Sequence, residues 1–309
     1  MKGPLFYAKI LLFGEYGIIK DAKGLSIPYN FYKGALKTIH TESEQAKSSN
    51  TKLRDYAVYL ESLDSSLVTF ALSRFQKDLD KGMYFDSSIP QGYGIGSSGA
   101  LVAAIYDRYA VDKITILENL TREKLLTLKE IFSQMESFFH GKSSGLDPLN
   151  SFLSLPILIH SKNHLEPTGI PSQQPSGLGA VFLLDSGMTG ETAPMVSIFM
   201  NQMESPAFRK MIKEQFIAYS DSCVEDFLKG DVKSLFGNLK QLSGVVLKHF
   251  KPMIPKQFHT LWHRGIETNA YYLKLCGSGG GGYILGFTQN LAQARAMLKD
   301  HRLEVVYTF

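Results

Sequence analysis

A glycine- and serine-rich segment is the clearest sign of chemistry in this chain. Residues 90–100 read Pro-Gln-Gly-Tyr-Gly-Ile-Gly-Ser-Ser-Gly-Ala, with four glycines within eight positions. Glycine lets a backbone come within hydrogen-bonding range of a bulky anion, and the free amides at the start of a helix attract negative charge. The two serine hydroxyls can cap that helix or ligate a phosphate-bound metal. The segment therefore predicts a phosphate-binding loop, with a plain helix-capping turn as the alternative.

Other phosphate-loop patterns match the chain less well. Residues 94–99 and 277–282 both satisfy G-x-G-x-x-G, and two matches in one chain show how permissive that pattern is. Neither lies in the strand–loop–helix setting that a dinucleotide fold requires. Gly141-Lys142-Ser143 resembles the end of a Walker loop, but Glu136 occupies the position of its first glycine. The chain has no H-R-D or D-F-G sequence, which excludes a protein kinase.

Three charged residues lie at positions where the sequence predicts burial or a turn, so each is either destabilising there or functional. Lys9 interrupts an apolar stretch, and a buried lysine is costly unless it pairs with an acid. Glu136 stands at the edge of the apolar stripe of a predicted helix, so it should face inward, although a carboxylate there can also reach water. Asp147 precedes Pro148, where an ordinary turn residue is the alternative. These three residues are candidates for charge chemistry.

Hydrophobic periodicity predicts the elements that position these residues. Strands are expected at residues 6–13, in a second extended piece ending at Pro28, and at 82–85, 152–159, 180–184, 283–287 and 303–307. Helices are expected at residues 56–78, 100–109, 117–139, most of 193–274, and 290–299. Loops are expected at residues 41–52 and 167–179, and a helix break at 143–148. The closing strand–helix–strand is typical of a ferredoxin-like layer.

Length and composition limit the class of protein. The chain has 309 residues, enough for two domains, and its 44% hydrophobic and 20% charged residues are typical of globular proteins. A net charge of +4 argues against nucleic-acid binding. Two isolated cysteines, Cys223 and Cys276, argue against structural zinc and agree with a reducing compartment. The apolar runs are far shorter than a membrane span, and Lys9 interrupts the one that resembles a signal peptide. We expect a cytoplasmic protein with no membrane partner.

Three segments, in the right order, resemble blocks of the GHMP small-molecule kinases, whose members phosphorylate galactose, homoserine, mevalonate and phosphomevalonate. Residues 90–100 resemble the signature P-x-G-x-G-L-G-S-S-A, with Ile95 for the usual Leu and Gly99 for the usual Ala. Residues 9–16 resemble the block K-x-x-L-x-G-E-H, and residues 274–282 resemble the block K-x-x-G-A-G-x-G-G. Together these blocks span almost the whole chain.

The resemblance implies a fold as well as an activity. The expected class is α+β, in the two-domain GHMP kinase fold. A ribosomal-protein-like α/β domain that binds ATP would occupy residues 1–185, and a ferredoxin-like domain would occupy residues 186–309. The expected activity is ATP- and Mg²⁺-dependent phosphorylation of a small-molecule alcohol. The assembly is left open, with a homodimer as one form.

Two more segments resemble those of mevalonate kinases. Residues 136–147 follow E-x-x-x-H-G-x-x-S-G-x-D, and residues 185–192 resemble D-[ST]-G-x-x-G-[ST]-T. The resemblance therefore implies conversion of mevalonate to 5-phosphomevalonate. Tyr16 departs from the usual His at a position associated with substrate contact. Phosphomevalonate kinases can carry G-E-Y there, so that activity, or another sugar or alcohol kinase of the family, is the alternative.

The resemblance also implies roles for individual residues. Asp147 would accept or orient the proton of the substrate hydroxyl. Lys9, the natural partner of that carboxylate, would polarise the substrate oxygen or stabilise the charge of the phosphoryl group. Ser98 and Glu136 would hold Mg²⁺, which prefers hard oxygen ligands. ATP would be bound by Gly92, Gly94, Gly96, Ser97, Ser98 and Gly99. The substrate would be contacted by Glu15, Tyr16, Ser144, Thr192, Gly277 and Gly279.

Readings from other classes have less support. Residues 141–145 match the G-x-S-x-G nucleophile elbow, but they follow an amphipathic helix and run into Pro148. His259 and His263 lack the intervening glutamate of a zinc protease. A non-catalytic ATP-binding protein remains as an alternative. The joint presence of a lysine, a serine and two carboxylates at the expected positions argues against it.

Overall fold

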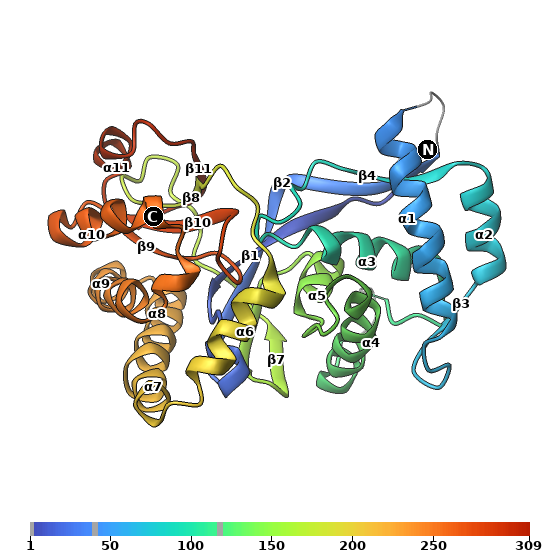
Figure 1. Ribbon diagram of the computed structural model, residues 1–309, viewed down its shortest axis with the longest axis horizontal. Helices are drawn as coiled ribbons and strands as arrows, with labels where there is room; N and C mark the ends of the chain where they lie inside the picture. Colours follow the sequence, from blue (N-terminus) through green and yellow to red (C-terminus); the bar gives the residue numbers. More distant parts are fainter. Residues whose placement is uncertain (1–2, 39–42, 116–119) are drawn as a thin grey trace. The chain divides into compact units, whose positions relative to one another are not determined.

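The computed structural model of the protein describes residues 3–38, 43–115 and 120–309. Within these residues the chain forms two compact units, each assembled from several segments (Figure 1). Unit 1 contains the residues up to Lys9, Pro28–Pro90 and Gly96–Leu155, and unit 2 contains Ile10–Ile27, Gln91–Ile95 and Pro156–Phe309. The single boundary expected at residue 185 stays a prediction. In the structure that residue ends a strand in the interior of a unit 2 sheet.

Two long strands contribute residues to both units. β1 (Phe6–Phe13) confirms the predicted first strand, and β2 (Gly24–Thr38) is its neighbour in a five-stranded sheet, longer than the extended piece predicted to end at Pro28. In unit 1, β2 pairs antiparallel with β4 (Met83–Ser87). In unit 2, β2 pairs with β6 (Ile157–Ser161), which in turn pairs with β7 (His164–Pro167).

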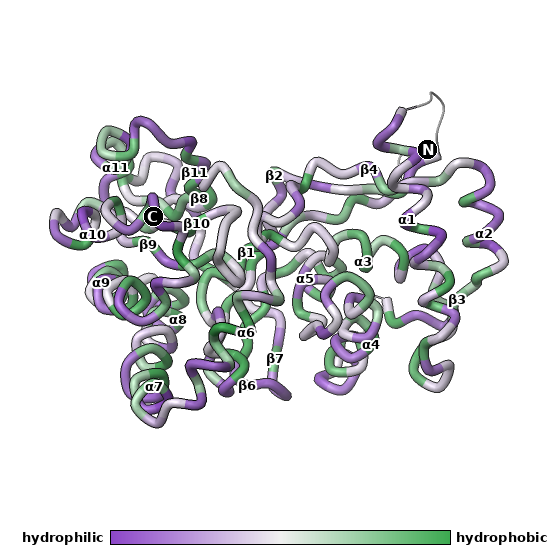
Figure 2. Tube along the Cα trace, viewed as in Figure 1, coloured by the Kyte–Doolittle hydropathy of each residue, from purple (hydrophilic) through white to green (hydrophobic). Residues whose placement is uncertain are grey.

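Helices make up most of unit 1. They are α1 (Glu44–Glu61), α2 (Leu72–Asp80), α3 (Ser97–Tyr109), α4 (Arg122–His140) and α5 (Leu146–Leu153), with a short strand pair, β3 (Thr69–Phe70) and β5 (Ala110–Val111). The rings of Tyr106, Phe132 and Phe152, one from each of α3, α4 and α5, meet edge to face with centroids 5.0–5.6 Å apart. Figure 2 shows that α3 is mainly hydrophobic whereas α2 carries many hydrophilic residues. The buried helix α3 is thus the centre of the unit 1 core.

Two predictions for unit 1 are wrong. The expected loop at residues 41–52 is helical from Glu44 onward, because the Ser43 side chain accepts a hydrogen bond from the Ala46 N–H and caps α1. The expected single helix at residues 56–78 is two helices, since α1 ends at Glu61 and α2 begins at Leu72. The polar solvent-facing side of α1 hid the helical period at its start. Residues 41–42, and residues 117–119 of the helix expected at 117–139, lie outside the described part of the chain.

The segment around Asp147 also differs from expectation. The strand expected at residues 152–159 begins only at Ile157, because α5 continues to Leu153. The helix break expected at residues 143–148 is confined to the residues before Leu146. Pro148 lies in the first turn of α5, where its missing N–H would have no helical partner in any case.

Unit 2 contains a four-stranded antiparallel sheet in the order β11-β8-β10-β9. Its strands are β8 (Ala180–Asp185), β9 (Tyr272–Leu275), β10 (Tyr283–Thr288) and β11 (Leu303–Thr308). In chain order these are strands one to four, and the fourth lies beside the first, as in a ferredoxin-like layer. Helix α11 (Leu291–Met297) connects β10 to β11. The predicted α+β class and the ferredoxin-like closing layer are confirmed.

The long connection between β8 and β9 is helical, as expected for most of residues 193–274. It contains α6 (Thr192–Gln202), α7 (Pro206–Met211), a π-helical turn (Ile212–Ile217), α8 (Ala218–Lys229), α9 (Val232–His249) and α10 (His259–Thr268). Both α9 and α10 pack against β9. Among the described residues, no helix is both long enough and apolar enough to cross a membrane.

Candidate functional site

The glycine loop adopts a backbone that only glycine takes readily. Gly92, Gly94 and Gly96 have φ angles of +76°, +77° and +79°, in the left-handed region. Gly96 is the N-cap residue of α3, and no side chain caps this helix, so the alternative of a serine cap is wrong. Ser97 and Ser98 are the first helical residues instead. Their amides belong to the turn where a helix attracts an anion.

Lys9 and Asp147 form an ion pair in unit 1, as the sequence predicted. The Lys9 Nζ lies 2.8 Å from Asp147 Oδ1, and the lysine side chain is 5% exposed whereas the aspartate is 35% exposed. Asp147 lies in the first turn of α5, after the N-cap Gly145, rather than in a plain turn. The pair therefore joins a buried cation to a carboxylate that solvent and ligands can reach.

Two glycines of α3 and its cap bring the helix close to this pair. A Cβ on Gly96 would lie 2.9 Å from Lys9 Cγ. A Cβ on Gly99 would lie 2.7 Å from the Asp147 carbonyl carbon and 2.8 Å from the Pro148 nitrogen. Contacts this short do not occur between real atoms of this kind, so the alanine usual in the family cannot be accommodated unless α5 moves.

We expect Gly99→Ala to lower the free energy of unfolding by about 1–3 kcal/mol, the usual cost of overpacking. The reaction rate should fall too, because the shift carries the Asp147 backbone with it. Urea unfolding and initial rates measure the two effects. Gly237→Ala is the matched control, since Gly237 lies within α9 with nothing near its missing Cβ. The control should be stabilised by up to about 1 kcal/mol. Equal behaviour of the two variants would contradict the close approach.

Glu136 lies at the centre of a hydrogen-bonded group in unit 1. Ser98 Oγ donates to Glu136 Oε1 at 2.8 Å, and Ser143 Oγ donates to Oε2 at 2.5 Å. His140 Nε2 lies 3.0 Å from Ser98 Oγ. Glu136 is 3% exposed, which confirms its predicted inward orientation and excludes a carboxylate that reaches out to water.

The charge of Glu136 is sensitive to its surroundings. Burial first, and the neighbouring Asp147 carboxylate second, raise the pKa of Glu136 to about 7, against the opposing effects of its two serine donors and of Lys9. Glu136, Asp147 and Lys9 are thus one electrostatic group. A cation placed beside the Glu136 carboxylate would favour its ionised form.

Unit 2 contains a second buried ion pair. Lys274 Nζ lies 2.5 Å from Glu15 Oε1, and the side chains are 5% and 6% exposed. The same ammonium donates to the Leu275 carbonyl at 2.9 Å. Glu15, expected to contact substrate, is therefore held by Lys274, which lies in β9 and begins the glycine-rich block of residues 274–282.

Tyr16 is held firmly at the end of the same block as Glu15. Its hydroxyl donates to the Ser278 carbonyl at 2.7 Å, and its ring lies 4.7 Å from that of Phe199, centroid to centroid. Burial, and next the charge of Glu15, raise the pKa of the Tyr16 hydroxyl well above its ordinary value. Tyr16 also has a φ angle of +59°, which is rare for a residue with a side chain. The phenol ties the strained backbone at Tyr16 to the second glycine run.

The two glycine-rich segments pack backbone against backbone within unit 2. A Cβ on Gly94 would lie 2.4 Å from the Cys276 carbonyl oxygen, and one on Gly282 would lie 2.5 Å from Tyr93 Cα. The Gly190 N–H donates to the Gly92 carbonyl at 2.9 Å. Several of these glycines are thus required by packing between the segments.

The remaining predicted residues have these positions. Ser144 Oγ accepts from the Leu146 N–H at 3.4 Å, and Thr192, the first residue of α6, accepts from Ser278 Oγ at 3.5 Å. Gly277 and Gly279 have φ angles of +71° and +79°. Within unit 1 the structure brings together Lys9, Ser98, Glu136 and Asp147.

Sequence reasoning assigned no role to three polar residues at these clusters. They are His140, Ser143 and Lys274. His140 follows Glu136 by four positions, so a helical wheel places both on one face. Ser143 had no such signal, because it lies beyond the end of α4.

Known proteins resemble this chain in sequence and in fold. Residues 66–154 match the GHMP kinases N terminal domain family. A mevalonate kinase of Pyrococcus horikoshii is 28% identical over 300 residues, covering 89% of this chain and 85% of the relative. A mevalonate kinase of Thermococcus onnurineus is 26% identical over 307 residues, with the same coverage.

Among solved structures, L. major mevalonate kinase in complex with R-mevalonate has a TM-score of 0.64 at 18% identity, and covers 100% of this chain and 99% of its own. Lactococcus lactis galactokinase complexed with galactose has a TM-score of 0.62 at 12% identity, covering 98% of this chain and 92% of its own. These likenesses concern the fold, and they confirm the predicted GHMP kinase architecture. In its N-terminal domain, its curated relatives and its fold, the chain resembles the GHMP kinases, and these likenesses support an ATP-dependent small-molecule kinase.

Proposed function

We propose that the protein transfers the γ-phosphoryl group of ATP to the hydroxyl of mevalonate and forms 5-phosphomevalonate. The observation that carries the proposal is the buried Lys9 paired with the reachable carboxylate of Asp147. The same unit holds the Ser98–Glu136 oxygen pair, with Ser98 in the first turn of the glycine-capped helix α3 and Glu136 on α4. The curated relatives, which are mevalonate kinases, support this choice of substrate.

In this reaction the protein mainly positions groups and supplies charge. Asp147 accepts the proton of the attacking hydroxyl at Oδ1 or Oδ2. Lys9, whose ammonium lies 2.8 Å from that carboxylate, stabilises the negative charge that develops on the transferred phosphoryl oxygens. The glycine loop, Gly92 to Gly99, and the amides of Ser97 and Ser98 bind the phosphates of ATP.

The donor set of Ser98 and Glu136 agrees with Mg²⁺. A hydroxyl and a carboxylate are hard oxygen ligands, and their oxygens lie 2.8 Å apart. We propose that these two side chains hold the ion, with water and phosphate oxygens as further ligands. When bound, Mg²⁺ neutralises charge on the ATP phosphates. His140 and Ser143 orient Ser98 and Glu136 through the hydrogen bonds described above.

The proposed contacts of mevalonate are polar side chains and glycines. We propose Glu15, Tyr16, Ser144, Thr192, Gly277 and Gly279 as its contacts. The Tyr16 hydroxyl donates its hydrogen bond to the Ser278 carbonyl, so it offers a substrate only its oxygen lone pairs as acceptors. The proposal includes a cytoplasmic location and leaves a homodimer as a possible assembly.

ADP release by the purified chain with MgATP tests the proposal. Mevalonate, phosphomevalonate, galactose and homoserine are supplied in parallel. Turnover on mevalonate supports the proposed reaction. The absence of ADP release with every alcohol, while ATP still binds, would overturn the proposed reaction in favour of a non-catalytic protein.

Phosphorylation of phosphomevalonate is the second candidate function, and Tyr16 is the observation that favours it. Turnover on phosphomevalonate alone would establish this reaction with the same catalytic residues. Tyr16→His tests whether the position selects between the two substrates. An unchanged ratio of kcat/KM on the two alcohols would show that Tyr16 is no selector.

We expect Glu136→Gln to raise the Mg²⁺ concentration needed for half-maximal rate at least tenfold, because an amide is a weaker ligand than a carboxylate. The measurement is the initial rate at fixed ATP over a Mg²⁺ series. Glu130→Gln is the matched control, since Glu130 lies on an exposed part of the same helix. An unchanged Mg²⁺ titration in Glu136→Gln would contradict its role as a ligand.

A further inference from the structure

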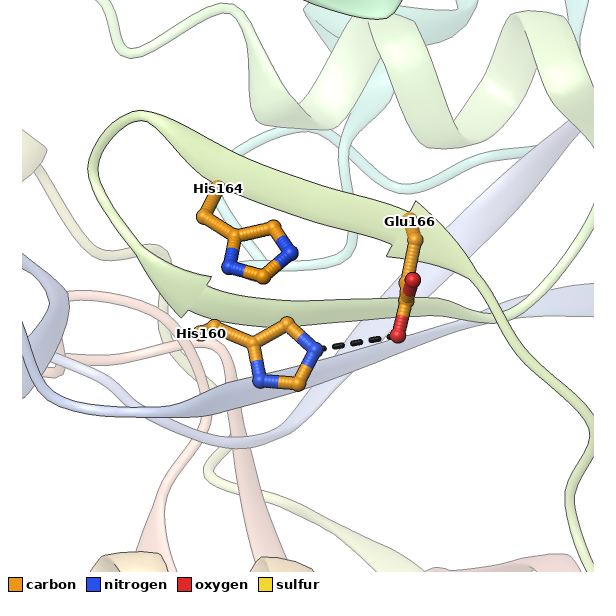
Figure 3. A group of neighbouring side chains, drawn as sticks. All are labelled: His160, His164 and Glu166. Atoms are coloured by element: carbon orange, nitrogen blue, oxygen red, sulfur yellow. Dashed lines mark hydrogen bonds and ion pairs between the residues drawn. The ribbon is translucent and has the colours of Figure 1, made fainter. Parts of the chain in front are cut away.

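Three side chains with metal-binding chemistry gather on the β6–β7 hairpin of unit 2 (Figure 3). Potential ligand atoms of His160, His164 and Glu166 all lie within 4.8 Å of one another. His160 Nε2 is 3.0 Å from Glu166 Oε1, and the two imidazole rings stack with centroids 4.3 Å apart. None of these residues belongs to the proposed kinase machinery.

The register of the hairpin explains why the three side chains share one face. Glu166 lies opposite Leu158, and His164 lies opposite Ser161. The pairing is irregular between Ile159 and Ser161, so His160 is the additional residue of a bulge. Because successive side chains alternate between faces, buried Ile159 points to one face while His160 points to the other with Glu166.

We propose that His160, His164 and Glu166 bind one Zn²⁺ ion, with water as the fourth ligand. Two imidazoles and a carboxylate are a donor set that zinc takes in tetrahedral geometry, with metal–ligand distances of about 2.0–2.2 Å. A tetrahedron of that size separates its ligand atoms by about 3.4 Å. The pair at 3.0 Å is already that close. The other ligand atoms need to move by little more than an ångström.

The hairpin allows that movement. His160 is 31% exposed and Glu166 is 53% exposed, so both side chains can rotate without disturbing the core. The carboxylate is the one acidic ligand among the three side chains, and an anionic ligand suits a divalent cation. Nitrogen donors also discriminate against Mg²⁺, which prefers oxygen.

Zinc at this position would fix the irregular end of the hairpin. The Lys162 N–H in the connecting turn donates to Asp21 Oδ1 at 3.1 Å, so the turn is already held at one point. A metal bridging His160 on β6 to Glu166 on β7 would join the two strands through their side chains. Both cysteines are buried and do not offer a competing surface site.

Isothermal titration of Zn²⁺ into the metal-free full chain, without nucleotide, tests the site. We expect one ion per chain, and at least tenfold weaker binding in each of His160→Ala, His164→Ala and Glu166→Gln. His263→Ala is the matched control, because His263 and Glu267 form a surface pair at 3.1 Å with only two donors. That variant should bind zinc as the unaltered protein does.

A thermal unfolding series provides a second measurement that does not depend on kinase activity. Zinc should raise the Tm of the unaltered protein and of His263→Ala, because a ligand that binds only the folded state stabilises it. The Tm of His160→Ala should not respond. Equal zinc affinity in the unaltered protein and the three hairpin variants would overturn the proposal, and so would the absence of stoichiometric binding.

Discussion

Asp147→Asn should lower kcat by about 10²–10⁴-fold, the usual contribution of a positioned general base. An asparagine has the size of the aspartate but cannot accept the proton of the attacking hydroxyl. It also leaves the Lys9 ammonium, 5% exposed, beside a neutral group. The KM for ATP should change little, because the substitution affects proton transfer and not the glycine loop. The measurement is steady-state ADP release on the alcohol that the unaltered protein turns over.

The exposed Lys37–Asp86 pair provides a matched control for Asp147→Asn. It joins the same two residue types at 2.5 Å, with side chains 55% and 43% exposed. Exposed pairs contribute about 0–1 kcal/mol, so Asp86→Asn should preserve both rate and stability. Circular dichroism of Asp147→Asn should match that of the unaltered protein. A kcat within tenfold of normal would refute the role of Asp147 as the base.

Lys274→Met should lower the free energy of unfolding by about 3–5 kcal/mol, the typical effect of removing one partner of a buried ion pair. The methionine fills most of the space of the lysine stem but leaves Glu15, 6% exposed, without the ammonium 2.5 Å away. A buried carboxylate that loses an ion-pair partner is more costly than the intact pair. Urea or thermal unfolding of the whole chain measures the loss.

The double variant Glu15→Gln/Lys274→Met separates pairing from packing. Removing both charges should recover a large part of the loss, because no buried charge then loses its ion-pair partner. Lys23–Glu225 is the matched control in the same unit, a pair at 2.5 Å with side chains 31% and 47% exposed. Lys23→Met should cost less than about 1 kcal/mol. A double variant as unstable as the sum of its two single variants would show that the charges do not interact.

The sequence predicted those helices and strands that can be recognised from the residues of the element itself. The apolar, β-rich run of residues in Phe6–Phe13 and the glycines that precede α3 define those elements by themselves. The start of α1 was missed because its cap, Ser43, opens a turn whose residues face solvent and lack apolar spacing. The interleaving of the two units was missed for a different reason. It depends on which strands pair across long separations, and composition does not record that.

Some features of the candidate site could likewise be predicted from the sequence, and others could not. The inward orientation of Glu136 followed from its position on a helical wheel, and a buried lysine at position 9 required an acid. The partner of Glu15 lies 259 positions away at Lys274, and no periodicity connects them. Gly99 is instructive, because the family signature makes alanine the expected residue there. Only the approach of α5 to within 2.7 Å of a Cβ at that position explains the glycine.

The interleaved order of the units has a consequence for biosynthesis. Residues 10–27 leave the ribosome early, yet they belong to unit 2, whose remaining residues are almost all encoded after position 155. The ring of Phe13 stacks on that of Phe287 at 5.5 Å. At a translation rate of about 5–20 residues per second, Phe287 is synthesised roughly 14–55 s after Phe13. During that interval its apolar strand is a natural substrate for chaperones, so slowing translation of the C-terminal third should increase aggregation of the nascent chain.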